Sequence, residues 1–241
     1  MRRARVVIEN QIMKHSRSLE GGLWFRTVCA ACNGLAGRYD NDYGSFAEEI
    51  HKRQMPGGLV LPKRNGVPSV KVVPGRVARS VLHAMVALAP SFRRIHPTFV
   101  AALQEDLPEL RLPEGLELRI ASTTDDFCRI SSGFAMHRVL TKRVDHFPLA
   151  EVFFRPLAWA LTGPAIGDTQ RLLDVEGWGD ATDWITCSPQ ASAVDLRDVI
   201  ESIPIVRHPM RGRRDEWVEL LGPESYLLEG FVPRGQVPKV N

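Results

Sequence analysis

Apolar residues recur every three or four positions in three stretches of the chain, which is the spacing of an amphipathic helix. The pattern predicts helices over residues 40–53, 74–89 and 97–103. The second has the widest apolar stripe and only a short polar face, so we expect it to be central to the core. That stripe consists of Val77, Val81, Met85 and Leu88.

The period changes to two after Pro113, where Leu116, Leu118 and Ile120 alternate with less apolar neighbours. Such alternation predicts a strand. A further helix is expected over residues 194–203, since capping residues precede it and Pro204 follows. The other strand candidates are residues 5–8, 23–28, 127–130, 134–140, 151–154 and 184–187.

These elements together predict an α+β fold. Short gaps between the strand candidates favour hairpins and therefore an antiparallel sheet. We expect a small N-terminal unit over residues 1–55, a Gly- and Pro-rich linker over residues 56–75, and a larger domain over residues 76–241 with helices and an antiparallel sheet.

Composition excludes several classes of protein. The formal net charge is +3, and 44% apolar with 24% charged residues is typical of a folded globular chain rather than a disordered one. No apolar run approaches the ~18 residues of a membrane span. The basic start is not followed by a long apolar stretch, so we expect no secretory signal peptide.

The chain has four cysteines, too few for a disulfide framework, so we expect a reducing compartment and a cytoplasmic protein. Cys128 and Cys187 stand apart from each other and are interpreted as buried free thiols. Cys29 and Cys32 differ from them, because they form a Cys-x-x-Cys pair. Asn33 follows this pair at once, and Gly37 comes four residues later.

Residues 21–37 resemble the second half of an HNH endonuclease domain of the zinc-stapled kind. In that family a treble-clef-like ββα unit ends in a Cys-x-x-Cys-Asn corner that opens its helix. The resemblance covers about residues 20–53 and is looser at residues 74–79 and 154–157. It implies a treble-clef-like ββα remnant at the N-terminus and a function related to nucleic acid.

The resemblance also implies two metal roles. Cys29 and Cys32 would hold a structural zinc, which needs four ligands in a tetrahedral array. Asn33 would lie at the edge of a catalytic divalent ion such as Mg²⁺, which polarises the phosphate while a histidine activates water.

The sequence departs from the family where catalysis needs it most. No first cysteine pair precedes Cys29, and the histidine upstream, His15, follows Lys14 rather than an acid. His51 and His83 lie on predicted helices. We therefore expect a chain that lacks the first half of the motif, or a degenerate relative, with no cleavage activity of its own. The alternative is a non-catalytic interaction protein that uses the cysteine corner as scaffold.

Each candidate residue has an alternative interpretation. Three interpretations of Cys29 and Cys32 stay open. The pair is a metal-free turn, a redox pair, or a zinc site whose other ligands come from His15, from a second copy in a homodimer, or from a partner protein. His15 is otherwise a solvated loop residue, and Asn33 a helix cap. A basic cluster could contact nucleic-acid phosphate or be a solvated loop. It comprises Arg207, Arg211, Arg213 and Arg214.

Overall fold

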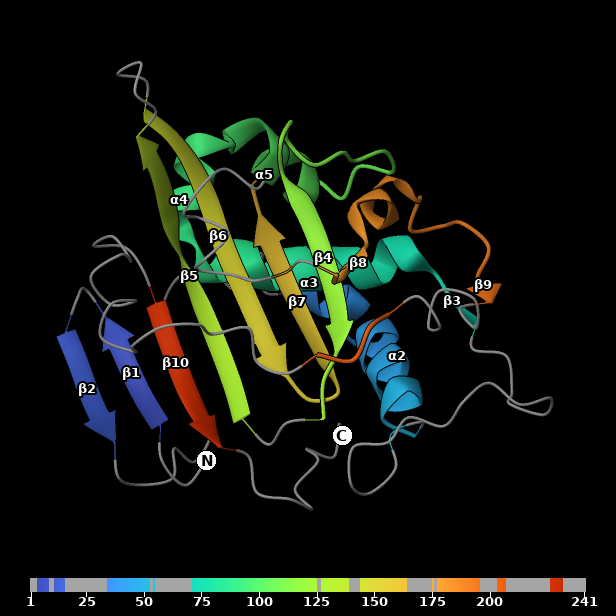
Figure 1. The fold of residues 1–241 in the computed structure, drawn as a ribbon. Coiled ribbons are helices and arrows are strands. Elements are labelled where there is room, and N and C mark those ends of the chain that lie inside the picture. The colour runs from blue at the N-terminus through green and yellow to red at the C-terminus, as the bar shows by residue number, and fades with distance from the viewer. Residues whose placement is uncertain are drawn as a thin grey trace.

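The fold is described from a computed structural model of the chain. The described residues are 4–8, 11–15, 34–52, 54, 71–124, 127–138, 144–163, 175, 177–195, 203–206 and 226–231. Within them the helices and strands form an α+β fold (Figure 1), which confirms the predicted class and the predicted antiparallel sheet.

Three of the helices begin with a proline in the first turn, where the missing N–H has no helical acceptor to lose. The predictions for residues 40–53, 74–89 and 97–103 are confirmed to within one or two residues. The helical elements are η1 (Gly37–Tyr39), α2 (Asp40–Lys52), α3 (Pro74–Leu88), α4 (Pro90–Ile95), α5 (Pro97–Gln104) and η2 (Thr182–Thr186).

The larger sheet is antiparallel throughout, with strand order β2-β1-β10-β5-β6-β7-β4-β8. A second sheet of two short strands pairs β3 with β9. The strands are β1 (Ala4–Ile8), β2 (Gln11–His15), β3 (Lys71–Val72), β4 (Glu117–Ser122), β5 (Phe127–Arg138), β6 (Val144–Phe154), β7 (Leu157–Thr162), β8 (Gly179–Asp180), β9 (Val194–Asp195) and β10 (Tyr226–Phe231).

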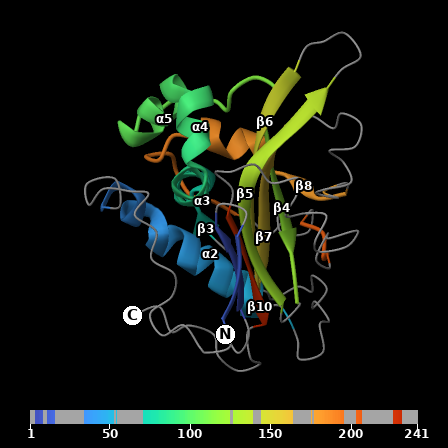
Figure 2. The ribbon, with the colours of Figure 1, turned by 90° about the vertical axis from the view of Figure 1, so that its left-hand side faces the viewer.

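Helices α2 to α5 all lie on one face of the sheet (Figure 2). Helix α3 crosses behind the strands, with α2 on one side of it and α4 and α5 on the other (Figures 1 and 2). Val77, Leu82 and Met85 of α3 have no exposed surface, which confirms that this helix is central to the core. Trp159 of β7 packs edge-on against Trp184 of η2, with ring centroids 5.8 Å apart.

The opposite face of the sheet carries a smaller apolar cluster and a buried ion pair. Phe153, Ala158 and Trp178 belong to this cluster. On the same face Arg129 Nε lies 3.2 Å from Glu151 Oε2, and neither side chain has exposed surface. Removing either charge would leave the other buried without its ionic partner, which is strongly destabilising.

Several sequence predictions differ from the structure. Residues 184–187 were predicted as a strand, but they fall largely in η2, where Trp184 and Ile185 point into the core. The helix predicted over residues 194–203 is wrong at its start, which is strand β9; residues 196–202 lie outside the described residues. The runs 127–130 and 134–140 belong to one long strand, β5.

The N-terminal segment shares its sheet and core with the rest of the chain. Strand β1 pairs with β10, which in turn pairs with β5. Phe46 and Ile50 of α2 lie in the same core cluster as α3. Elements that the sequence assigned to residues 1–55 therefore pack directly against elements of residues 76–241. No helix in the described part of the chain is long and apolar enough to cross a membrane.

Candidate functional site

Most of the residues singled out by the sequence lie outside the described residues. These include the corner itself, Cys29, Cys32 and Asn33, so its zinc and divalent-ion roles stay predictions. The basic cluster also lies outside; it comprises Arg207, Arg211, Arg213 and Arg214. Among the described residues, no three histidine, cysteine or acidic side chains gather in a way that could hold a metal ion.

Of the candidate site residues named from the sequence, only His15 lies within the described backbone. It was interpreted as a loop residue, but it is the last residue of strand β2 and pairs with Ala4 of β1. The loop interpretation is therefore wrong. The short run Gln11–His15 has too few β-branched or aromatic residues to be recognised as a strand, and its pairing with β1 supplies the order.

After the corner, the structure describes the chain from residue 34 onward. Residues 34–36 are helical, and they continue through η1 into α2. The segment is fixed at two points. The Tyr39 hydroxyl donates to the Asp106 carboxylate at 2.6 and 2.7 Å, and Ser80 Oγ donates to Asp40 at 3.0 Å. Burial and the bond to Asp106 raise the pKa of Tyr39 to about 12, so its proton stays available for donation.

Asp106 occupies the left-handed position that ends α5. Its φ is +55°, and its N–H donates to Leu103 O while the next N–H donates to Ala102 O. These two bonds form a Schellman motif, in which glycine is the usual residue at this position. Aspartate is one of the few other residues that tolerate it. Here its carboxylate faces Tyr39 and Arg79.

Arg79 is fully buried, yet its guanidinium is well supplied with acceptors. It donates to Gly75 O at 3.1 Å, Cys187 O at 3.0 Å and Leu107 O at 2.8 Å. Its Nε lies 3.4 Å from Asp106 Oδ1. Burial lowers the pKa of Arg79, and the charge is retained through these partners. We call Tyr39, Arg79 and Asp106 the Arg79 cluster.

Gly75 is required where α3 passes the segment after η2. A Cβ at this position would lie 2.0 Å from Cys187 O and 2.9 Å from Cys187 C, which no side chain could accommodate. Cys187 is a free thiol, as predicted, but it is only partly buried rather than buried. Its carbonyl oxygen accepts a hydrogen bond from Arg79.

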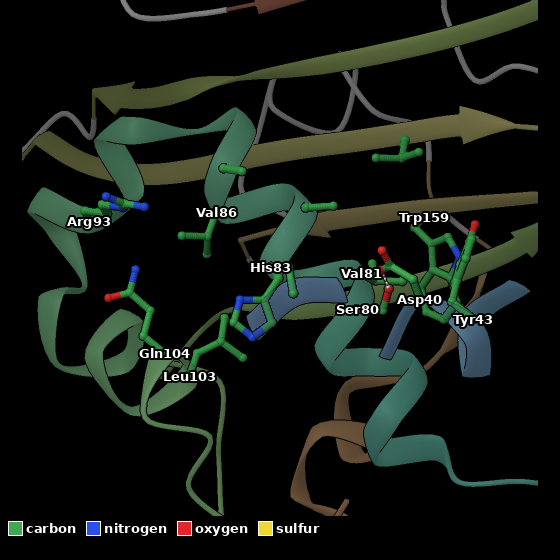
Figure 3. Close-up of a pocket in the computed structure, with 14 residues that line it drawn as sticks. Asp40, Tyr43, Ser80, Val81, His83, Val86, Arg93, Leu103, Gln104 and Trp159 are labelled. Carbon is green, nitrogen blue, oxygen red and sulfur yellow. Dashed lines mark hydrogen bonds between the residues drawn. The ribbon is translucent and has the colours of Figure 1, made fainter. Parts of the chain in front are cut away.

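A cavity of about 340 Å³ extends along α3 between α2 and the pair α4–α5. At the α4–α5 end, His83, Arg93 and Gln104 come from three different helices and point toward the same space, between the apolar side chains of Val86 and Leu103 (Figure 3). The remaining lining residues are Ala36, Asp40, Tyr43, Ser80, Val81, Ala84, Ala87, Val152 and Trp159.

Two of the polar residues at this end, His83 and Arg93, differ from the Arg79 cluster in how they are paired. His83 is 8% exposed, and no hydrogen bond to its ring occurs among the described residues. Burial lowers the pKa of His83, so its imidazole is neutral at pH 7. Arg93 likewise has no carboxylate within ion-pair distance in the described part of the chain. We call His83, Arg93 and Gln104 the cavity triad.

The sequence placed His83 on a predicted helix. It did not identify the cavity or the Arg79 cluster. Arg79 donates mainly to main-chain carbonyls, which leave no signature in the sequence. No protein-family model, curated protein or solved structure matches this chain.

Proposed function

We propose that this protein is a nucleic-acid-binding relative of the HNH endonucleases that does not cleave by itself. The proposal rests on the Cys-x-x-Cys-Asn sequence at Cys29, Cys32 and Asn33. One structural observation supports it: residues 34–36, the first described residues after Asn33, are helical, as expected after a corner that leads into a helix. Arginine greatly outnumbers lysine among the basic residues of this chain, and the guanidinium group is well suited to contact phosphate.

The attachment of this helix supports a binding role. The helical segment is fixed to α3 through Ser80 and to the end of α5 through Tyr39. Phe46 has no exposed surface and seats α2 in the core. The corner is therefore joined to a rigid support rather than to a linker, and rigid elements hold a binding site more accurately than loops do.

Hydrolysis would need a general base, and the histidine upstream of the corner, His15, follows Lys14 rather than an acid. His51 and His83 lie on α2 and α3, as predicted, and His83 faces the cavity between helices (Figure 3). Losing a general base alone costs ~10²–10⁴ in rate. We therefore propose binding without cleavage.

The first test measures nucleic-acid affinity by fluorescence anisotropy, with duplex DNA, single-stranded DNA and RNA at low salt. We expect binding to at least one probe that weakens steeply with added salt. The variant C29S/C32S should weaken this binding, and the matched variant C128S/C187S should not. Absence of binding to all three probes would favour the second candidate, an interaction protein with the corner as scaffold.

The second test is plasmid nicking with magnesium, manganese, nickel and zinc in turn. We expect no nicking, because the corner supplies at most part of a metal site and no base. Nicking that survives purification and disappears in N33A would contradict the proposal. His15 would then be the first histidine to replace.

A further inference from the structure

The cavity triad has the composition of a ligand site. Binding pockets are typically concave and mostly apolar, with a few polar groups converging on one point. Here the apolar walls are Val86 and Leu103, and the converging groups are the cavity triad (Figure 3). A volume of about 340 Å³ lies within the usual range for small organic ligands.

The charge at this end of the cavity selects the ligand class. Arg93 is a cation without an ionic partner among the described residues, and it lies at the end of α4. Its planar guanidinium matches the oxygens of a carboxylate or a phosphate ester. His83 is neutral and offers one donor and one acceptor. Among the described residues, no acidic side chain lines this end; Asp40 lines the other end, where it accepts from Ser80.

We propose that the cavity binds a small organic anion, with its anionic group on Arg93 and its apolar body between Val86 and Leu103. Gln104 and His83 hydrogen-bond the ligand's polar atoms beside that group. The cavity triad uses none of the corner residues, Cys29 to Asn33, on which the proposed nucleic-acid function depends. It can therefore be tested without nucleic acid, and either proposal can fail alone.

The experiment measures dissociation constants for the full chain by NMR titration with four probes. Hexanoate and hexyl phosphate carry the two possible anionic groups. 1-Hexanol has the apolar body alone, and inorganic phosphate has the anion alone. We expect at least one hexyl anion to bind about tenfold or more tightly than both 1-hexanol and inorganic phosphate. Which hexyl anion binds more tightly distinguishes a carboxylate from a phosphate ester.

Variants assign the binding to the cavity. R93Q should weaken the hexyl anion about tenfold and leave 1-hexanol unchanged, whereas R94Q, on the next residue of α4, should change neither. A87F places a ring in the cavity lining and should weaken every hexyl probe. Three outcomes would each overturn the proposal. 1-Hexanol could bind as tightly as the anions, R93Q and R94Q could weaken anion binding equally, or no hexyl probe could bind. R93Q keeps the test decisive if A87F fails to fold.

Discussion

Arg79 and His83 lie one helical turn apart on α3, yet they belong to two polar clusters built in different ways. Arg79 is fully buried, donates to main-chain carbonyls on three segments and pairs with Asp106. His83 is nearly as buried, but its ring has no hydrogen bond among the described residues. A buried charge with an ionic partner and several carbonyl acceptors stabilises a fold, whereas a buried polar group facing an open cavity remains available to a ligand.

The comparison predicts that the two clusters respond differently to substitution. The largest effect is expected for R79M, which removes the guanidinium and leaves four carbonyl acceptors and Asp106 without it. We expect a loss of about 3–5 kcal/mol in the free energy of unfolding, measured by urea denaturation. The matched variant R76Q, on the same helix but half-exposed, should cost about 1 kcal/mol or less. Similar losses in both variants would show that the buried Arg79 contributes no more to stability than the half-exposed Arg76.

Asp106 has two roles: its backbone ends α5, and its carboxylate accepts from Tyr39 and pairs with Arg79. If it served only to end α5 at φ +55°, D106G would stabilise the protein by up to about 1 kcal/mol, because glycine adopts this conformation without strain. We expect instead a net loss of about 1–3 kcal/mol, since Tyr39 and Arg79 lose their shared acceptor. A stabilised D106G protein in the same denaturation assay would show that the carboxylate contributes little.

Tyr39 should give a smaller effect. Y39F removes only the hydroxyl that donates to Asp106, while the ring stays packed. We expect a loss of about 1.5 kcal/mol, the lower end of the range for one hydrogen bond to a charged group. In the double variant Y39F/D106G the two losses should not add, because both break the same interaction. Additive losses would mean that Tyr39 contributes through packing elsewhere.

The smallest effect concerns the pH dependence of stability. Burial lowers the pKa of His83 in the folded state below its ordinary value of about 6.5. The unfolded chain therefore binds more protons, so stability is present above about pH 6.5 and is lost as the pH falls through that value toward the folded pKa. Burial also lowers the pKa of His96, so His96 adds to the loss of stability as the pH falls.

The variant H83Q isolates the contribution of His83. It keeps a neutral polar side chain in the cavity but cannot be protonated. Between about pH 7.5 and about pH 5.5 it should lose less stability than the original chain, measured by urea denaturation at each pH. The matched variant H96Q should keep most of the original loss. If H83Q follows the same pH profile as the original chain, the His83 ring is not desolvated.

Much of the fold could be predicted because its helices are periodic. The stripe of α3 and the spacing in α2 gave their bounds to within one or two residues. Helix α4 was missed because a six-residue helix has too few turns to show a period. Residues Thr182–Thr186 contain Trp and Ile, which favour a strand, but packing of Trp184 in the core overrides that preference.

The candidate site was less predictable than the fold. The motif at Cys29–Asn33 was recognisable, because its residue types and spacing are specific. The two clusters on α3 were not, because their partners come from segments far apart in sequence. Asp106 follows α5 and would be taken for a turn residue, and Arg79 would be taken for a surface arginine. Only the packing of α3 against α5 and the segment after η2 brings these groups together.

The zinc content of the purified chain tests the corner independently of both clusters. Two thiolates alone leave half of a tetrahedral coordination sphere unfilled, so we expect at most weakly bound zinc after dialysis against a chelator. Elemental analysis that finds one tightly held zinc per chain would contradict this. It would require additional ligands, from His15, from a second copy or from a partner protein.

The most direct test of the difference between the two clusters is the pKa of His83, followed by NMR in the free chain and with hexanoate or hexyl phosphate. We expect the pKa of His83 to lie below about 6.5 in the free protein. This pKa should rise when the anion binds beside the ring, because a nearby negative charge favours imidazolium. R93Q should abolish the rise at the same anion concentration, and R94Q should retain it. If the pKa of His83 in the free protein is at or above about 6.5 and neither anion changes it, His83 is neither desolvated nor beside an anion site.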